Sequence, residues 1–364
     1  MSAGWIVGLA DAAAADVATV GGKGAGLHRL VALGARVPAG FVVTTDAFRA
    51  ALDTVAAQVE APLQALGPDA PIDAVERAAA QARARLLRTA SAGPVLEEVR
   101  AAYDDLAGGI ARVAVRSSAV GEDAAGASFA GEHDTFLEIR GRDAVADAVC
   151  RCWASLYTAR AVSYREHAGA GPAGAMAVVV QEMVPARAAG VFMTLNPANG
   201  DRSTVVCEAV WGLGEPLVSG AVTPDRFVVD KVSGEVVRRE IADKPRQLVR
   251  GEMPGTAEVD VSAERRGRPC LDDAELAELL DLARRVERDA GVPQDGEFAV
   301  AEPGGPARVH LLQTRPETVW STRAPRAATN GSGARTALSA VLATLTRGAA
   351  ATSTTPEGTP DHGG

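Results

Sequence analysis

Aromatic side chains are scarce in this chain: they make up 4% of its 364 residues, although hydrophobic residues together reach 47%. The core must therefore be built mainly from Ala, Val and Leu, which favours helices packed on sheets over an aromatic-rich β-sandwich. A chain of this length is sufficient for two or three domains of about 100 to 200 residues each. We expect a mixed α/β (α+β) fold.

Long runs of like charge are absent as well, and the net charge is −9. A nucleic-acid partner would require a basic surface, so this class of partner is excluded, whereas a small anion held by a few local cations is not. The first residues, MSAGWIVGLADAAAAD, form no positively charged leader. No apolar run reaches about 18 residues, so we expect a cytoplasmic protein that does not bind membranes.

Cysteine is also rare, and no two cysteines form a CxxC pair. The spacing typical of zinc sites and disulfide frameworks is missing, which favours buried free thiols. The four residues concerned are Cys150, Cys152, Cys207 and Cys270.

Hydrophobic spacing predicts the order of the elements. We expect helices at 24–33, 46–57 (after a cap at Thr44-Thr45), 72–86, 95–106, 143–167 and 272–290, and strands at 37–43, 204–210 and 226–230. The nearly continuous apolar run AMAVVVQEMV, at 175–184, indicates a strand buried on both faces. Beyond Trp320 the composition shifts to Ala, Thr, Gly, Ser and Pro, which predicts a disordered tail.

The segment TVGGKGAGLHRL, residues 19–30, places four glycines around Lys23. It matches neither the Walker pattern, which needs Ser or Thr after the lysine, nor GxGxxG. A lysine on a glycine-rich approach to a helix start can hold a phosphate, because free N–H groups and the helix dipole favour an anion there. An ordinary helix-start turn is the alternative.

A long polar loop follows the predicted strand RVAVRSS and ends near Thr135. Its small donors, among them Ser128 and Gly131, could close over phosphates, although an ordinary surface loop is equally compatible with them. Its GASFAG stretch misses the GxSxG elbow, so a serine hydrolase is not expected. At the end of the strand, Arg116 could direct a fork of donors at a phosphate.

The C-terminal stretch DGEFAVAEPGGPARVHLLQTR predicts a hairpin that turns at the PGGP sequence. If the pairing is centred near Gly305, Glu297 lies opposite Gln313 and Asp295 opposite Arg315. Strand side chains alternate, so all four share one face, with opposed Cβ atoms about 5 Å apart. Two carboxylates and an amide oxygen suit Mg²⁺, and Arg315 would contact phosphates and lower the carboxylate pKa values. A solvated face is the alternative, since a one-residue slip in register would scatter the set.

Five blocks then occur in a fixed order: GGKGAGLHRL with GARVPAGFVVTTDAF, VRSSAVGEDAAGASFAGEHDTFLEIRG, VVVQEMVPARAAGVFMTLNP, AVWGLGEPLVSGAVTPDRFVVDK and LLQTRPETVW. Together they resemble the nucleotide-binding part of the phosphoenolpyruvate synthase and pyruvate phosphate dikinase family, over about residues 5 to 320. Rifampicin phosphotransferase and the ATP-binding subunit of phenylphosphate synthase are similar in the same region.

This resemblance implies an ATP-grasp fold in which two lobes, 1–189 and 190–320, close over Mg-ATP and a disordered tail follows at 321–364. Lys23 and Arg116 would then hold phosphates, the loop from Ser128 through Gly131 to Thr135 would cover them, and Arg315 would clamp the transferred phosphate. The adenine would meet Gln181, Glu182, Met183 and Val184. The metal ligands would be Glu297 and Gln313, with Asp295 nearby.

The chain departs from the family in two respects. Gly296 stands where the family usually has a bulky apolar residue, which we expect to loosen that strand. Family members continue into a phosphohistidine domain and an acceptor-binding domain, and they split ATP to AMP, placing the β-phosphoryl on the histidine. None of the five histidines here has a GGxxSHAA-like setting. We therefore expect the acceptor histidine on a partner subunit, which would carry the swivelling phosphohistidine domain and the acceptor-binding domain. A direct small-molecule kinase and an ATP-binding regulatory module without turnover are the alternatives.

Overall fold

The computed structural model describes residues 4–53, 55–67, 70–89, 93–119, 135–159, 161–162, 175–302, 309–318 and 320. Residues Met1–Thr322 form one compact unit. The predicted tail at 321–364 and most of the predicted phosphate-covering loop, including Ser128 and Gly131, lie outside the described residues.

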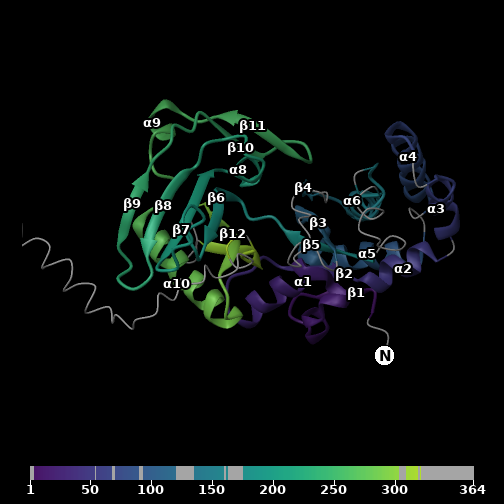
Figure 1. The fold of residues 1–364 in the computed structure, drawn as a ribbon, viewed down its shortest axis with the longest axis horizontal. Coiled ribbons are helices and arrows are strands. Elements are labelled where there is room, and N and C mark those ends of the chain that lie inside the picture. Colours follow the sequence, from purple (N-terminus) through teal and green to yellow (C-terminus); the bar gives the residue numbers. More distant parts are fainter. Residues whose placement is uncertain are drawn as a thin grey trace, which may run out of the picture. The chain divides into compact units, whose positions relative to one another are not determined.

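The first sheet has five antiparallel strands in the order β1-β2-β5-β3-β4 (Figure 1). These strands are β1 (Ile6–Gly8), β2 (Gly40–Val43), β3 (Val113–Ala119), β4 (Thr135–Ile139) and β5 (Met176–Glu182). Among the described residues, this half of the chain contains the helices α1 (Val17–Ala32), α2 (Thr45–Leu52), α3 (Ala56–Gln64), α4 (Ile72–Thr89), α5 (Pro94–Asp105) and α6 (Arg142–Ser155), and 3-10 helices at Ala12–Ala15 and Leu106–Gly109. The predicted cap before α2 is confirmed, because the Thr44 side chain accepts a hydrogen bond from the Ala47 N–H.

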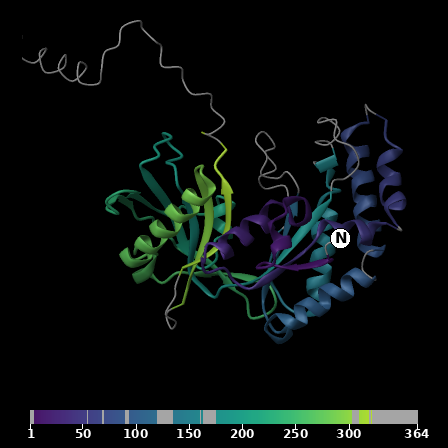
Figure 2. The ribbon, with the colours of Figure 1, turned by 90° about the horizontal axis from the view of Figure 1, so that it is seen from below.

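The second sheet has six antiparallel strands in the order β13-β12-β6-β7-β8-β9, and α10 lies against it (Figure 2). The strands are β6 (Ala186–Met193), β7 (Thr204–Trp211), β8 (Asp225–Asp230), β9 (Val236–Glu240), β12 (Gln294–Ala301) and β13 (Val309–Pro316). A separate hairpin pairs β10 (Arg246–Arg250) with β11 (Thr256–Asp260), and the helices are α8 (Glu215–Val218), α9 (Ala263–Arg266) and α10 (Asp273–Ala290). A capping box formed by Asp272 and Glu275 begins α10 where the sequence predicts it. None of the described helices is long and apolar enough to span a bilayer.

The strand β5 is buried on both faces, as its apolar run predicts. Because strand side chains alternate, Val178 and Val180 enter a core shared with α2, α5 and α6, whereas Val179 enters a second core. That second core also holds Leu27 of α1 and Phe298 of β12. The helix α1 thus contacts both sheets.

The chain passes from the first sheet to the second at residues 183–185, between β5 and β6. The predicted boundary at 189/190 falls inside β6. The segment after α1 also joins the second sheet, because the Arg36 carbonyl accepts a hydrogen bond from the Leu311 N–H at 2.9 Å. The division into two lobes remains a prediction.

Candidate functional site

A cavity of about 610 Å³ is lined by strands of both sheets. Every predicted site residue that the structure describes lines this cavity. The predicted phosphate ligands among them are Lys23, Arg116, Thr135 and Arg315, the predicted adenine contacts are Gln181, Glu182, Met183 and Val184, and the predicted metal ligands are Asp295, Glu297 and Gln313. A volume of this size is typical of small-molecule and cofactor sites.

Lys23 lies just past a kink in α1. At the kink Gly21 has a φ of 69°, which an L side chain rarely adopts. The Ser118 hydroxyl of β3 inserts into the helix there: it accepts from the Gly24 N–H at 3.3 Å and donates to the Val20 carbonyl at 2.8 Å. A side chain inserted into the i to i−4 ladder is a recognised cause of helix kinks. Ser118 therefore fixes the backbone on both sides of Lys23.

Arg116, two residues before Ser118 on β3, reaches across to the second sheet. Its Nη1 lies 3.4 Å from Oε2 of Glu297 and 3.5 Å from the Leu312 carbonyl oxygen, and its side chain is 13% exposed. A guanidinium and a carboxylate thus face each other inside the cavity.

The predicted hairpin register is confirmed at Asp295, Gly296 and Glu297, and from Phe298 onward it is wrong by one residue, because Phe298 pairs with Leu311 and not with Leu312. Asp295 pairs with Arg315 and Glu297 with Gln313, and all four line the cavity. The predicted opposite face is also confirmed, since Phe298, Val300, Val309 and Leu311 are fully buried. The sequence did not predict the β-bulge after Glu297, where the register shifts and Leu312 becomes the extra residue.

The electrostatics of Asp295 differ from the prediction. Arg315 lies 3.8 Å from the Asp295 carboxylate, and we expected it to lower the pKa. Burial instead raises the pKa of Asp295 to about 6, because desolvation outweighs the attraction of Arg315, and nearby Glu317 adds to the rise. The expectation of a lowered pKa is therefore wrong for Asp295. Its proton must leave before the carboxylate can bind a cation.

Gly296 does not leave a gap in β12. A Cβ atom at this position would lie 2.3 Å from two ring carbons of Phe192, its partner across the sheet, and Phe192 is fully buried. The ring of Phe192 thus occupies the space that a larger residue at position 296 would take. This packing does not support the expectation of a loosened strand.

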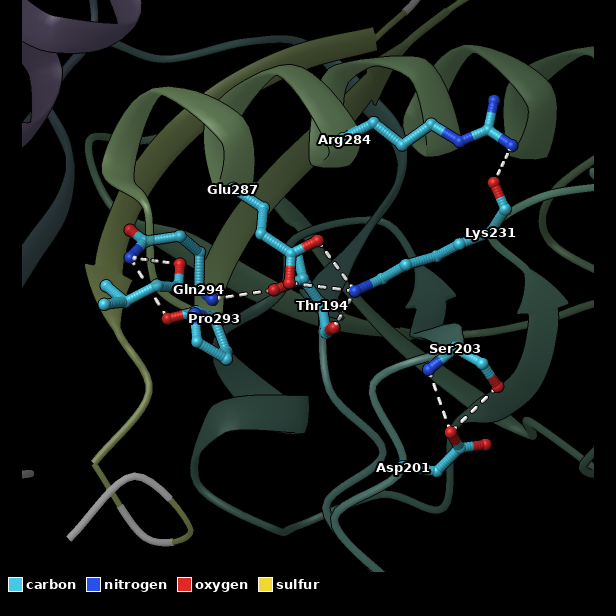
Figure 3. Close-up of polar contacts among 9 residues, drawn as sticks. Thr194, Asp201, Ser203, Lys231, Arg284, Glu287, Pro293 and Gln294 are labelled. Carbon is cyan, nitrogen blue, oxygen red and sulfur yellow. Dashed lines mark hydrogen bonds and ion pairs between the residues drawn. The ribbon is translucent and has the colours of Figure 1, made fainter. Parts of the chain in front are cut away.

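The beginning of β12 is fastened by a polar network (Figure 3). The Gln294 N–H donates to the Thr194 hydroxyl at 2.7 Å, and Gln294 in turn accepts from the Thr194 N–H at 2.8 Å. Lys231 contacts the Thr194 carbonyl, and its Nζ lies 2.7 Å from the carboxylate of Glu287 on α10. The network anchors the strand directly before Asp295.

An apolar wall of the cavity was not predicted from the sequence. Leu213, which precedes α8, Leu217 and Val218 of α8, and Ala189 and Val191 of β6 line the cavity. The block AVWGLGEPLVSG contains the first three residues, so their place in an ordered motif was the available signal. An apolar lining with a few charged groups is typical of small-molecule and cofactor sites.

Comparison with known proteins identifies the family. Residues 17–334 match the pyruvate phosphate dikinase, AMP/ATP-binding domain, and the chain belongs to this family. It is 41% identical over 326 residues to rifampicin phosphotransferase of Streptomyces sviceus, which covers 86% of this chain and 36% of that protein. It is 38% identical over 336 residues to phosphoenolpyruvate synthase of Aeropyrum pernix, covering 84% and 41%.

A probable phosphoenolpyruvate synthase of Methanothermobacter thermautotrophicus is 39% identical over 310 residues, covering 83% of this chain and 44% of that protein. The chain thus spans less than half the length of these relatives. The resemblance inferred from the five sequence blocks is confirmed, and the family supports ATP as the nucleotide.

Proposed function

We propose that this chain binds Mg-ATP in the cavity, within an ATP-grasp fold, and passes a phosphoryl group to an acceptor outside the described residues. One observation carries the proposal: the described residues expected from the family to bind phosphates, adenine and metal, although far apart in the sequence, line a single cavity. Membership of a family of AMP/ATP-binding domains and similarity to named phosphotransferases support it.

Lys23, Arg116 and Arg315 supply the positive charge that the triphosphate needs. Phosphoryl transfer asks little covalent chemistry of a protein, so positioning and neutralisation of charge provide most of the catalysis. Glu297 is paired with Arg116 at 3.4 Å. Binding of Mg-ATP would replace this pair with a carboxylate-to-metal contact and a guanidinium-to-phosphate contact, which keeps both charges compensated.

The donors available for Mg²⁺ fit that ion. Asp295 and Glu297 offer carboxylate oxygens, and Gln313 offers an amide oxygen. Among the described residues, no group of three or more His, Cys, Asp or Glu side chains could hold a metal ion. This is compatible with Mg²⁺, which is usually bound by one or two carboxylates together with substrate phosphates and waters. The ion would neutralise charge on the phosphates.

The acceptor that we propose is a histidine on a partner subunit with a swivelling phosphohistidine domain and an acceptor-binding domain. No histidine is found among the described residues that line the cavity, which supports an acceptor brought from elsewhere. In the proposed reaction a histidine nitrogen attacks the β-phosphorus of ATP and AMP leaves. The γ-phosphoryl group is transferred to water and released as inorganic phosphate.

The test is to incubate the purified chain with Mg-ATP, with and without lysate of its source, and to resolve AMP, ADP and phosphate. AMP that forms only with lysate supports transfer to a partner histidine. ADP from the chain alone would replace this proposal with a self-contained small-molecule kinase. No product in either case would indicate a regulatory ATP-binding module.

Glu297→Ala serves as the active-site variant in this assay, and Glu264→Gln, which alters an exposed carboxylate of α9, is the matched control. We expect Glu297→Ala to abolish turnover while the strand stays folded, and the control to behave as wild type. Turnover retained in Glu297→Ala would refute the metal assignment.

A further inference from the structure

Glu138 has a backbone conformation that is unusual for its residue type. Its φ is 57°, and among the described residues it is the one non-glycine residue with a positive φ. It lies in a β-bulge of β4, since Ile139 pairs with Val113 but Phe136 pairs with Val115. Bulges redirect side chains, and strained residues persist where the surroundings over-determine them. The neighbouring Leu137 lines the cavity, whereas Glu138 is not among the lining residues.

The bulge directs the Glu138 carboxylate to two arginines. Its Oε2 lies 3.3 Å from Nη1 of Arg112 and 3.1 Å from Nε of Arg250, and the Glu138 side chain is 1% exposed. The Glu138 carbonyl also accepts a hydrogen bond from the Gly255 N–H at 3.2 Å. Arg250 and Gly255 belong to the β10–β11 hairpin, which reaches toward β4 in Figure 1. A buried carboxylate held by two guanidinium groups and its own backbone is a strong tether.

The segments that contain the two arginines are hydrogen-bonded to different walls of the cavity. The Arg112 carbonyl accepts a hydrogen bond from the N–H of Met183, a predicted adenine contact, at 2.8 Å. On the hairpin, the Leu248 carbonyl accepts from the Leu213 N–H at 2.8 Å, and Leu213 belongs to the apolar wall. Glu138 therefore joins three parts of the cavity: β4, the segment after β5, and the wall after β7.

We propose that Glu138 is a positioning residue and that the β10–β11 hairpin is a strap that holds these three walls at the separation a nucleotide requires. Glu138 acts through Arg112 and Arg250 rather than by touching the ligand. The proposal rests on the proposed function, because it assumes that the ligand of the cavity is ATP. It predicts that cutting the strap weakens nucleotide binding without removing any lining side chain.

The test uses Arg250→Met in the full chain. Arg250 is 46% exposed, so the substitution breaks its contact with Glu138 and leaves Arg112 as a partner for the buried carboxylate. The matched control is Arg246→Met on the same strand: Arg246 is 50% exposed and pairs with Glu258 and Asp260 inside the hairpin. Both variants should remain folded at the temperature of the binding measurement, as thermal unfolding would check.

For Arg250→Met we expect ATP to bind about three- to tenfold more weakly in a calorimetric titration, because a charged hydrogen bond that holds the cavity walls is lost. A tenfold change in affinity corresponds to about 1.4 kcal/mol. Amide hydrogen exchange at 212–218 should become faster in the ligand-free variant. Arg246→Met should change neither quantity. Glu138→Gln should weaken ATP binding in the same way as Arg250→Met if it folds.

Two results separate this inference from the proposed function. Wild-type protein that binds no ATP would refute the proposed function, and the exchange measurement would still decide whether the strap exists. Wild-type protein that binds ATP, together with unchanged affinity and unchanged exchange in Arg250→Met, would overturn the strap. A fall in thermal stability alone, with normal affinity and exchange, would also overturn it.

Discussion

Replacing Gly296 by leucine would place a side chain where the ring of Phe192 already lies. The first atom of that side chain would lie 2.3 Å from two ring carbons, whereas carbon atoms in contact are about 3.5–4.0 Å apart. Phe192 is fully buried, so its ring cannot turn into solvent. Overpacking of this kind costs about 1–3 kcal/mol, and Phe192→Ala alone should cost about 3–5 kcal/mol through the cavity it leaves.

The two changes should compensate each other in the double variant. Leucine at position 296 would fill the space vacated by the ring, and a nearly volume-conserving exchange costs less than about 1.5 kcal/mol. If the residues were independent, the costs would sum to about 4–8 kcal/mol. Urea unfolding of the ligand-free variants, followed by circular dichroism, measures the difference.

The control for this cycle is Gly267→Leu, because no atom lies within 4 Å of a Cβ at position 267. Additive costs in the double variant would refute the idea that Phe192 takes the place of a side chain at position 296. A cost for Gly296→Leu as small as for the control would refute it equally.

Three further outcomes are expected. The free energy of unfolding of the wild type without ligand should fall as the pH rises from about 4 to 6, because native Asp295 keeps its proton up to about pH 6 and the unfolded residue loses it near 3.8. Asp295→Asn should remove this pH-dependent part of the stability, which amounts to up to ~3 kcal/mol before solvent screening. Identical pH profiles of stability in the two proteins would disprove the raised pKa. Ser118→Ala should weaken ATP binding by about tenfold, as expected for a lost hydrogen bond near Lys23. The control is Ser155→Ala, which should leave the affinity unchanged because the Ser155 hydroxyl donates within its own helix. Equal affinities of the two variants in calorimetry would contradict this role of Ser118. Burial raises the pKa values of the Cys150 and Cys207 thiols to about 12. These thiols should therefore not react with a disulfide reagent at pH 8 until the protein unfolds. Rapid labelling of the native protein would count against their burial.

The hairpin β12–β13 was predictable because its information is local. Its two strands are close in the sequence, and alternation assigns Glu297 and Gln313 to one face and Phe298 to the other. The bulge at Leu312 was not predictable, because the alternation of residue types gives no sign of an extra residue there. The packing of Phe192 against Gly296 depends on a strand about a hundred residues away.

The kink in α1 and the contacts of Glu138 could not be predicted from sequence patterns. Four glycines indicated a special backbone near Lys23, but the partner that fixes it, Ser118, comes from another strand. For Glu138, an ordinary glutamate between Leu137 and Ile139 gives no signal of a positive φ. Contacts of this kind depend on which distant segments meet, and hydrophobic period does not encode them.

The alternation of β5 between two cores bears on how the chain can be divided. Leu27 and Leu30 of α1 share one core with Val179 on the first sheet and with Phe298 and Leu311 on the second. A fragment that ends after β5 would expose these apolar side chains of α1 to water, which favours aggregation over folding. The start of the chain should therefore be protected from proteases only once β12 and β13 have been made.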